Sequence, residues 1–272
     1  MFDLLKNLMK KRKAGEDAGG NAKNDPLPEK GGVEIDKAQV LARSGERRDS
    51  FGVSEPRGDG LLAVLAEGER NANGSEAAVK AALSSFRTEK GDYSDEATLL
   101  RILARAREAV QGRSQTDDGT TFLAALIRNR QLHFLSVGRI RLYLLRSGDL
   151  VQLNRDYVYG REIDKLTLGE VLKRGEAERE RQHAAMGSRL ESAGALNIDR
   201  NVSPVWLYPG DKLALLSDGV FDSLTEEELT ALLNRSPRNA AEAVKEAVLA
   251  KSLPQQDNLT VIVLEIIETA RG

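Results

Sequence analysis

The chain has 272 residues, of which 40% are hydrophobic and 30% charged, and its formal net charge is −2. This is the composition of an ordinary soluble globular protein with enough chain for a sizeable core. A charge so near zero provides no global field to recruit nucleic acid, so we expect no nucleic-acid partner. The sequence has no cysteine and two histidines, so metal chemistry must rest on carboxylates, which favour Mg²⁺, Mn²⁺ or Ca²⁺.

Two segments precede the expected domain. Residues 1–13 place large apolar side chains on a helical period ahead of four basic residues. This pattern is typical of an amphipathic helix with weak peripheral contact to an anionic membrane, or of a solvated terminal helix. Residues 14–32 predict a flexible linker. No run approaches the roughly 20 apolar residues of a membrane span, and no signal-peptide pattern is present, so we expect a cytoplasmic protein.

From residue 33 the pattern is rich in strands, and we expect one domain over residues 33–268. Strands are predicted at 40–42, 51–53, 61–66, 122–127, 133–137, 141–145, 213–216 and 259–266, and helices at 75–86, 95–110, 225–233 and 237–250. The three strands between 122 and 145 have hairpin spacing and predict a meander. Helices come in consecutive pairs, which predicts antiparallel sheets packed together with helices outside.

Acidic residues stand at the edges of strands that lie far apart in the chain: Asp49, Glu67, Asp218 and Asp257. Asp218 follows the apolar run 213–216 and precedes Gly219, which lets the backbone turn and come close to a ligand. A carboxylate in that position is either a helix N-cap or a metal ligand. Together the four residues predict one carboxylate-lined site closed by folding.

Five motifs occur in a characteristic order: Asp49-Ser50, Gly119-Thr120-Thr121, Val137-Gly138 before a strand ending Tyr143-Leu144-Leu145-Arg146, Leu216-Ser217-Asp218-Gly219, and Asp257-Asn258-Leu259-Thr260-Val261. Together they resemble the metal-dependent serine/threonine protein phosphatases of type 2C, the PPM family, in a divergent bacterial-style form. The similarity runs from about residue 42 to residue 264. It implies an α+β fold, a four-layer α-β-β-α sandwich of two antiparallel sheets flanked by helix pairs.

In that family two Mn²⁺ or Mg²⁺ ions lie between the sheets, and a water that bridges them attacks the phosphorus of phosphoserine or phosphothreonine. Carried over by motif, the resemblance implies that the metal ligands here are Asp49, Glu67, the carbonyl of Gly68, Asp218 and Asp257. It also implies a phosphoprotein substrate and the activity of a phosphomonoester hydrolase.

Two departures from the family pattern change the implied metal ligands. Glu67 stands where the family has aspartate, and its extra methylene displaces the carboxylate oxygens by over an ångström. Mg²⁺ demands near-ideal octahedral geometry and tolerates such a shift poorly. Arg70 and Asn71 replace glycines that follow in bacterial members, at a place where the backbone normally approaches the metal.

Two further departures concern arginines. The family's phosphate-binding arginine aligns with Ser44, so Arg43, Arg47 or Arg48 can stand in only with a shift in register. Arg139 replaces an aspartate that helps to hold a third metal. A guanidinium beside Asp218 and Asp257 can neutralise the cluster without an ion; alternatively, Arg139 points to solvent and a two-metal site survives.

Two functions remain as alternatives for the folded domain, and a non-enzymatic membrane-tethered scaffold that uses the first helix is compatible with either. The first is an active, weak protein phosphatase with an altered metal site that prefers Mn²⁺. The second is a catalytically inactive pseudophosphatase, which keeps the sandwich and binds a phosphoprotein, a kinase or a regulator without hydrolysis. The charged segment 156–195 borders the cleft in this family, so we expect it to influence the choice of partner.

Overall fold

The computed structural model describes residues 31–40, 48–54, 60–68, 72–88, 94–111, 119–155, 189–190, 196–234, 239–253 and 256–268. The expected terminal helix at 1–13, the linker up to residue 30 and nearly all of segment 156–195 lie outside the described residues, as do Ser44, Arg70 and Asn71. Within the described part of the chain, no helix is long and apolar enough to cross a membrane.

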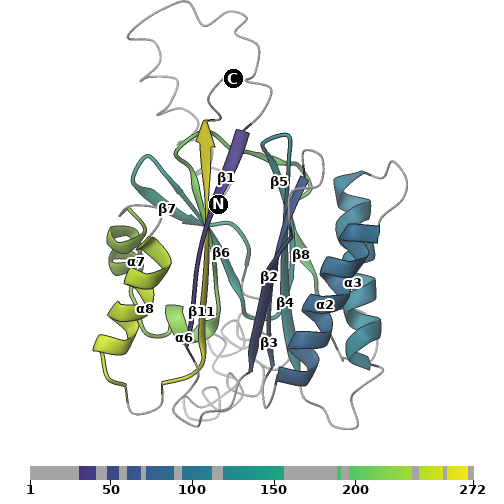
Figure 1. Ribbon diagram of the computed structural model, residues 1–272, viewed down its shortest axis with the longest axis horizontal. Helices are drawn as coiled ribbons and strands as arrows, with labels where there is room; N and C mark the ends of the chain where they lie inside the picture. The colour runs from purple at the N-terminus through teal and green to yellow at the C-terminus, as the bar shows by residue number, and fades with distance from the viewer. Residues whose placement is uncertain are drawn as a thin grey trace, which may run out of the picture.

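Two antiparallel sheets form the centre of the molecule (Figure 1). Sheet A has the order β1-β11-β10-β6-β7, with β1 (Gly31–Val40), β11 (Leu259–Glu268), β10 (Lys212–Leu216), β6 (Arg141–Arg146) and β7 (Asp149–Gln152). Sheet B has the order β2-β3-β4-β5-β8, with β2 (Asp49–Val53), β3 (Gly60–Gly68), β4 (Thr120–Arg128), β5 (Gln131–Val137) and β8 (Asp199–Arg200), and the short β9 (Val205–Trp206) also pairs with β5.

Helices cover the outer face of each sheet. Helices α2 (Ala72–Thr88) and α3 (Asp95–Gln111) pack on sheet B, and α6 (Asp218–Phe221), α7 (Glu226–Leu233) and α8 (Ala240–Ala250) pack on sheet A (Figure 1). The layers therefore run α-β-β-α, and the predicted α+β sandwich of two antiparallel sheets is confirmed.

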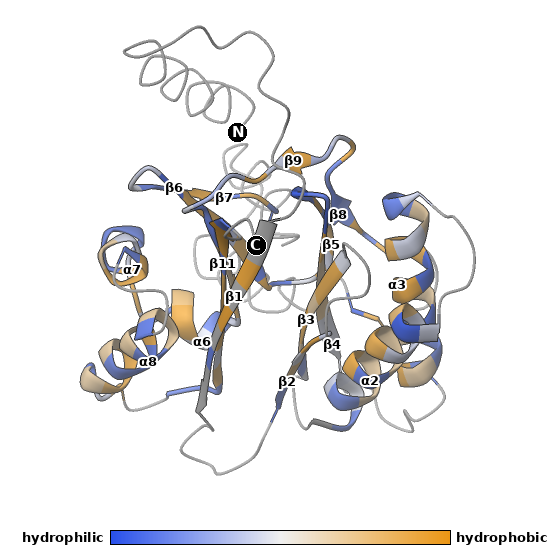
Figure 2. Ribbon diagram, turned by 45° about the horizontal axis from the view of Figure 1, so that its top comes forward, coloured by the Kyte–Doolittle hydropathy of each residue, from blue (hydrophilic) through white to orange (hydrophobic). Residues whose placement is uncertain are grey.

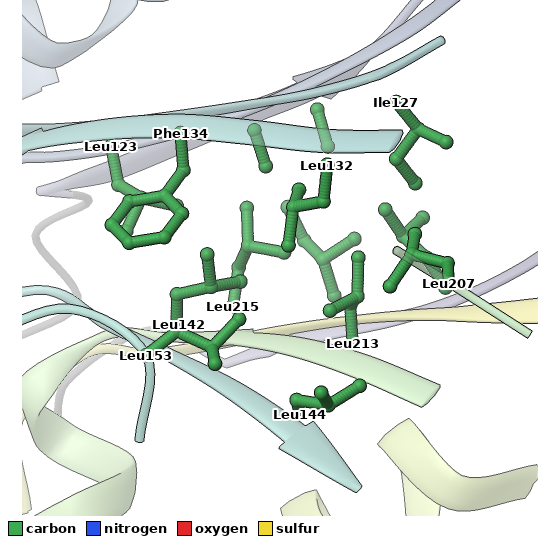
Figure 3. Packing of buried hydrophobic residues seen from close by; sticks show 14 of the residues in the cluster. Leu123, Ile127, Leu132, Phe134, Leu142, Leu144, Leu153, Leu207, Leu213 and Leu215 are labelled. Carbon is green, nitrogen blue, oxygen red and sulfur yellow. The ribbon is translucent and has the colours of Figure 1, made fainter. Parts of the chain in front are cut away.

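The strands are apolar on both faces because each sheet packs against the other sheet on one face and against helices on the other. In β3, Leu61, Ala63 and Leu65 enter the core between the sheets, whereas the alternate residues pack beneath α2 and α3. Figure 2 shows the strands largely apolar and the helices mixed. In Figure 3, Leu123 and Leu132 of sheet B face Leu213 and Leu215 of sheet A. Two-sided burial explains why these strands appear in the sequence as continuous apolar runs rather than as alternating patterns.

Two helices begin with caps that their sequences predict, Ser94 before α3 and Thr225 with Glu228 at α7. The Ala97 N–H donates to the Ser94 hydroxyl at 3.3 Å at the start of α3. At the start of α7, the Glu228 N–H donates to the Thr225 hydroxyl and the Thr225 N–H donates to the Glu228 carboxylate, at 3.2 and 2.8 Å. This reciprocal capping box satisfies two backbone donors that the helix cannot pair internally.

The predicted meander is wrong at its second connection. Strands β4 and β5 form a hairpin through Asn129 and Arg130, both with positive φ, but β6 belongs to the other sheet. The chain crosses between the sheets from Gly138 to Ile140, and β6 pairs with β10 and β7. Spacing alone cannot distinguish a short connection within one sheet from a short crossing between two sheets.

The first strand is longer than predicted. It spans Gly31–Val40 and pairs along its whole length with β11, so its first two residues lie where the linker was expected to end. Polar residues such as Glu34, Asp36 and Gln39 interrupt its apolar pattern, as is common in a strand at the edge of a sheet. The sequence pattern therefore indicated a strand only near residue 40.

Candidate metal centre at one end of the two sheets

A polar row crosses one end of sheet B. Asp49 on β2, Glu67 on β3 and Thr121 on β4 stand directly opposite one another across the strands. Leu65 and Leu123, two residues away on the same strands, lie in the core between the sheets. Because side chains alternate along a strand, Glu67 and Thr121 point to that same interior face. The row therefore closes the apolar core with polar side chains.

Sheet A supplies the facing side of this end. The Thr260 hydroxyl donates to Asp49 Oδ2 at 2.7 Å, which joins β11 to β2. The Thr260 N–H donates to the Ser217 hydroxyl at 2.8 Å, and the Ser217 N–H donates to the Thr260 carbonyl at 3.1 Å. Asp49 and Ser217 are fully buried, and the bond from Thr260 to Asp49 fixes the spacing of the two sheets beside the carboxylates.

Asp218 does not cap a helix. The N-cap of α6 is Ser217, which makes no side-chain capping bond, and Asp218 is the first helical residue. Its carboxylate instead lies beside that of Glu67 across the gap between the sheets, where a protonated Glu67 can donate a hydrogen bond to it. Gly219 lets α6 pass close to β11, because a Cβ atom there would lie 2.0 Å from the carbonyl oxygen of Asn258. This close approach brings Asp218 next to Asp257.

The carboxylates repel one another in a partly dehydrated place. Burial raises the pKa of Asp49 to about 6, against the hydrogen bonds from Thr260 and Ser217, and the charges of Asp218 and Asp257 add to the rise. Burial followed by the charges of Asp218 and Asp49 raises the pKa of Glu67 well above its usual range. Burial also raises the pKa of Asp218, although Glu67 and Arg139 oppose this shift. The cluster therefore favours binding either a proton or a cation.

Arg139 lies against Asp218, as in the first of its two alternatives, but not against Asp257. Its Nη1 is 3.4 Å from Asp218 Oδ2, its Nη2 pairs with Asp222, and its guanidinium carbon lies 5.1 Å from the centre of the Phe221 ring. Asp222 was missed in the sequence; its position one helical turn after Asp218 is the signal that could have found it. The interpretation that Arg139 points to solvent does not describe this structure.

Asp257 is paired by Arg48 instead. The Nη1 of Arg48 is 3.4 Å from Asp257 Oδ1, and its Nε is buried without a hydrogen-bond partner. Of the three arginines considered for phosphate binding, Arg48 therefore lies at the cluster. Arg43 and Arg47 lie outside the described residues. Gly68 ends β3, and its N–H donates to the Arg48 carbonyl at 2.9 Å, which fixes its backbone beside Asp49.

The donor set fits a hard divalent cation in its chemistry. Carboxylates are the ligands that Mn²⁺ and Mg²⁺ prefer, and the buried Glu67 Oε2 and Thr121 Oγ1 have no hydrogen-bond partner. Among the described residues, however, no three histidine, cysteine or acidic side chains converge closely enough to hold an ion as they stand. Binding an ion there requires the side chains, and the guanidinium of Arg139 among them, to move.

Comparison with known proteins identifies the family. The family model for Protein phosphatase 2C matches residues 40–255, which is most of the chain, so the chain belongs to that family. The serine/threonine phosphatase stp of Listeria monocytogenes serotype 4b is 31% identical over 155 residues, covering 57% of this chain and 59% of that protein. The chain thus matches about three fifths of the length of that curated relative.

Solved structures support the fold. A serine/threonine phosphatase from S. agalactiae aligns over 87% of this chain and all of that chain, with a TM-score of 0.67 at 21% identity. The catalytic domain of the phosphatase PstP, solved in complex with two manganese ions, aligns over 87% of this chain and 99% of that chain, with a TM-score of 0.62 at 22% identity.

Replacing Gly219 by alanine should separate α6 from β11. The added Cβ meets backbone rather than a flexible side chain, so we expect a loss of about 1–3 kcal/mol in the free energy of unfolding, measured with urea. Gly148→Ala shows the cost of a positive φ without a clash, about 1 kcal/mol, because nothing lies within 4 Å of an added Cβ there. A loss for Gly219→Ala well below about 1 kcal/mol would contradict the close approach.

The raised pKa of Asp49 predicts a pH-dependent stability difference. Between about pH 4 and 6 the folded carboxyl keeps its proton while the unfolded one loses it, so this group's contribution to stability falls as pH rises. The free energy of unfolding of metal-free Asp49→Asn, measured with urea, should therefore rise relative to that of the wild type by up to about 3 kcal/mol across this window and then stay level. A constant difference from pH 4 to 8 would show that burial does not raise this pKa.

Proposed function

We propose that this domain is a metal-dependent phosphoserine/phosphothreonine protein phosphatase with weak activity. The observation that carries the proposal is that Asp49, Glu67, Asp218 and Asp257, from four separate chain segments, lie near one another at one end of the sheets, where burial raises the pKa of the first three. Those residues and the Gly68 carbonyl would hold Mn²⁺ or Mg²⁺. Membership of the Protein phosphatase 2C family and the likeness to a manganese-bound phosphatase support the same assignment.

When bound, a pair of such ions supplies an activated water and neutralises charge on the leaving oxygen. The chain's own residues supply position and substrate binding. Thr260 fixes the carboxylate of Asp49 through its hydrogen bond. Arg48 stands at the edge of the cluster with its Nε unpaired, so it would donate to the phosphate of a phosphoprotein substrate, where a planar guanidinium binds two oxygens at once.

Two features weaken the affinity for metal in this proposal. Glu67 is longer than the aspartate of the family by one methylene, and Arg139 already neutralises Asp218. The site would therefore prefer Mn²⁺, since Mg²⁺ requires near-ideal octahedral geometry and releases its water reluctantly.

A catalytically inactive pseudophosphatase is the second candidate. Arg139 pairs with Asp218 and Asp222, and Arg48 pairs with Asp257, so three carboxylates at this end already have cationic partners. In this case the domain would bind a phosphoprotein, a kinase or a regulator without hydrolysis. For either candidate we propose a cytoplasmic location, with segment 156–195 influencing partner choice and residues 1–13 making weak peripheral contact with membranes.

Phosphate release from a phosphothreonine peptide across a Mn²⁺ titration distinguishes the two candidates. We expect slow release that needs high Mn²⁺, and none from Asp218→Asn, which loses a ligand charge. Combining Glu67→Asp with Arg139→Asp should raise the rate, because it shortens one ligand and removes the competing guanidinium. Folded wild-type protein that releases no phosphate, with no gain in the double variant, would exclude the phosphatase and favour the pseudophosphatase.

A further inference from the structure

The position of Arg139 depends on a short crossing between the sheets. Strand β5 ends at Val137 in sheet B, and β6 begins at Arg141 in sheet A. Gly138 turns the chain with a φ of 89°, and Ile140 is fully buried in the core between the sheets. Arg139 lies between these two residues, so whatever fixes the crossing also fixes the start of its side chain.

Asn154, just beyond β7, holds this crossing from inside the protein. Its Nδ2 donates to the Ile140 carbonyl at 2.6 Å and to the Ser136 hydroxyl at 3.1 Å. Its Oδ1 accepts the Leu142 N–H at 2.7 Å. The side chain is 1% exposed, and both ends of its amide are used. The three partners belong to sheet B, to the crossing and to sheet A, so one amide ties together the two sides of Arg139.

An amide is well suited to this position. The two carbonyl or hydroxyl acceptors need an N–H donor, and the backbone N–H needs an acceptor. Aspartate cannot donate to the acceptors, and a shorter or apolar side chain would leave buried groups unpaired. The arrangement therefore holds the backbone next to Arg139 through one buried amide.

At its outer end, Arg139 meets the cluster. The guanidinium pairs with Asp218 and Asp222 and stacks on Phe221, where the guanidinium carbon of Arg141 lies 4.0 Å from the ring centre. A guanidinium and a metal ion compete for the same Asp218 carboxylate. Anything that holds the guanidinium in place therefore lowers the affinity of the site for the ion by the same free energy.

We propose that Asn154 is a positioning residue for Arg139, and that by holding the crossing it sets how strongly the guanidinium competes with a divalent cation for Asp218. The proposal rests on the proposed function only in taking Asp218 as a metal ligand. It assigns the affinity for metal to a residue that is buried between the sheets rather than to the ligands alone.

The first test uses the metal-free protein. Asn154→Ala and Arg139→Met are combined in a double-mutant cycle, with Tm measured in the presence of EDTA; methionine keeps an apolar stem against Phe221 and removes the charge. We expect Asn154→Ala to lower Tm less in the Arg139→Met background than in the wild type, because part of its effect acts through Arg139. Additive losses in Tm would overturn the proposal.

The matched control is Asn201→Ala. The Asn201 amide also makes three hydrogen bonds, to the Leu132 carbonyl, the Ser203 carbonyl and the Phe134 N–H, but at the other end of β5. Asn201→Ala should therefore lower Tm in a similar way, and its effect on Tm should be the same with and without Arg139→Met. Coupling of equal size for Asn201→Ala would mean that the cycle reports general loosening of β5.

The second test measures Mn²⁺ binding by calorimetry. We expect Arg139→Met to bind Mn²⁺ about tenfold more tightly than the wild type, within the usual range for coupled ligands. Asn154→Ala should tighten Mn²⁺ binding several-fold when Arg139 is present and leave it unchanged in the Arg139→Met background. Asn201→Ala should leave the affinity for Mn²⁺ unchanged in both backgrounds. An effect of Asn154→Ala that is absent, or equal in both backgrounds, would refute the positioning role.

If Asn154→Ala does not fold, Ser136→Ala replaces it in both tests, since it removes one partner of the amide and should act in the same direction more weakly. If no variant binds Mn²⁺, the proposed function and the competition for Asp218 both fail, and the metal-free cycle decides only whether Asn154 positions Arg139. If Mn²⁺ binds without phosphate release, the pseudophosphatase is favoured and the role of Asn154 is still decided by the coupling to Arg139.

Discussion

The hydrogen bond from Thr260 to Asp49 joins the two sheets at the end where the acidic residues meet. Much of the surface between the sheets consists of leucine, isoleucine, valine and phenylalanine side chains, which pack without specifying one orientation. A buried, directional bond between β11 and β2, continued to Ser217, sets the spacing at this end. The positions of Asp218 and Glu67 relative to each other depend on that spacing.

Concentrating carboxylates there opposes folding, and the fold accommodates them in several ways at once. Hydrogen bonds from Thr260 and Ser217 stabilise the charge of Asp49, a protonated Glu67 can donate to Asp218, and Arg48 and Arg139 pair with acidic partners. Such concentrations of like charge are typical of sites where function is retained at the expense of stability. A metal ion and a guanidinium are alternative solutions to this electrostatic problem.

The crossing from sheet B to sheet A links the core to that choice. Ile140 is held in the apolar interior, Asn154 is hydrogen-bonded to the Ile140 carbonyl, the Leu142 N–H and the Ser136 hydroxyl, and Arg139 extends from this crossing to the cluster. A change deep in the sandwich can therefore reach the site without touching a ligand. The route is short and consists of packed side chains and hydrogen bonds, which is the kind of contiguous network that carries coupling.

The sequence by itself determined the strands with continuous apolar runs, the capped helices at Ser94 and Thr225, and the four acidic positions at strand edges, because these follow from local periodicity and local hydrogen bonding. Only the tertiary structure decided that β6 leaves the sheet of β5, that Arg139 pairs with Asp222 rather than Asp257, and that Arg48 takes Asp257. Ion pairs depend on which segments meet in space, and a charged side chain carries no local signal of its distant partner.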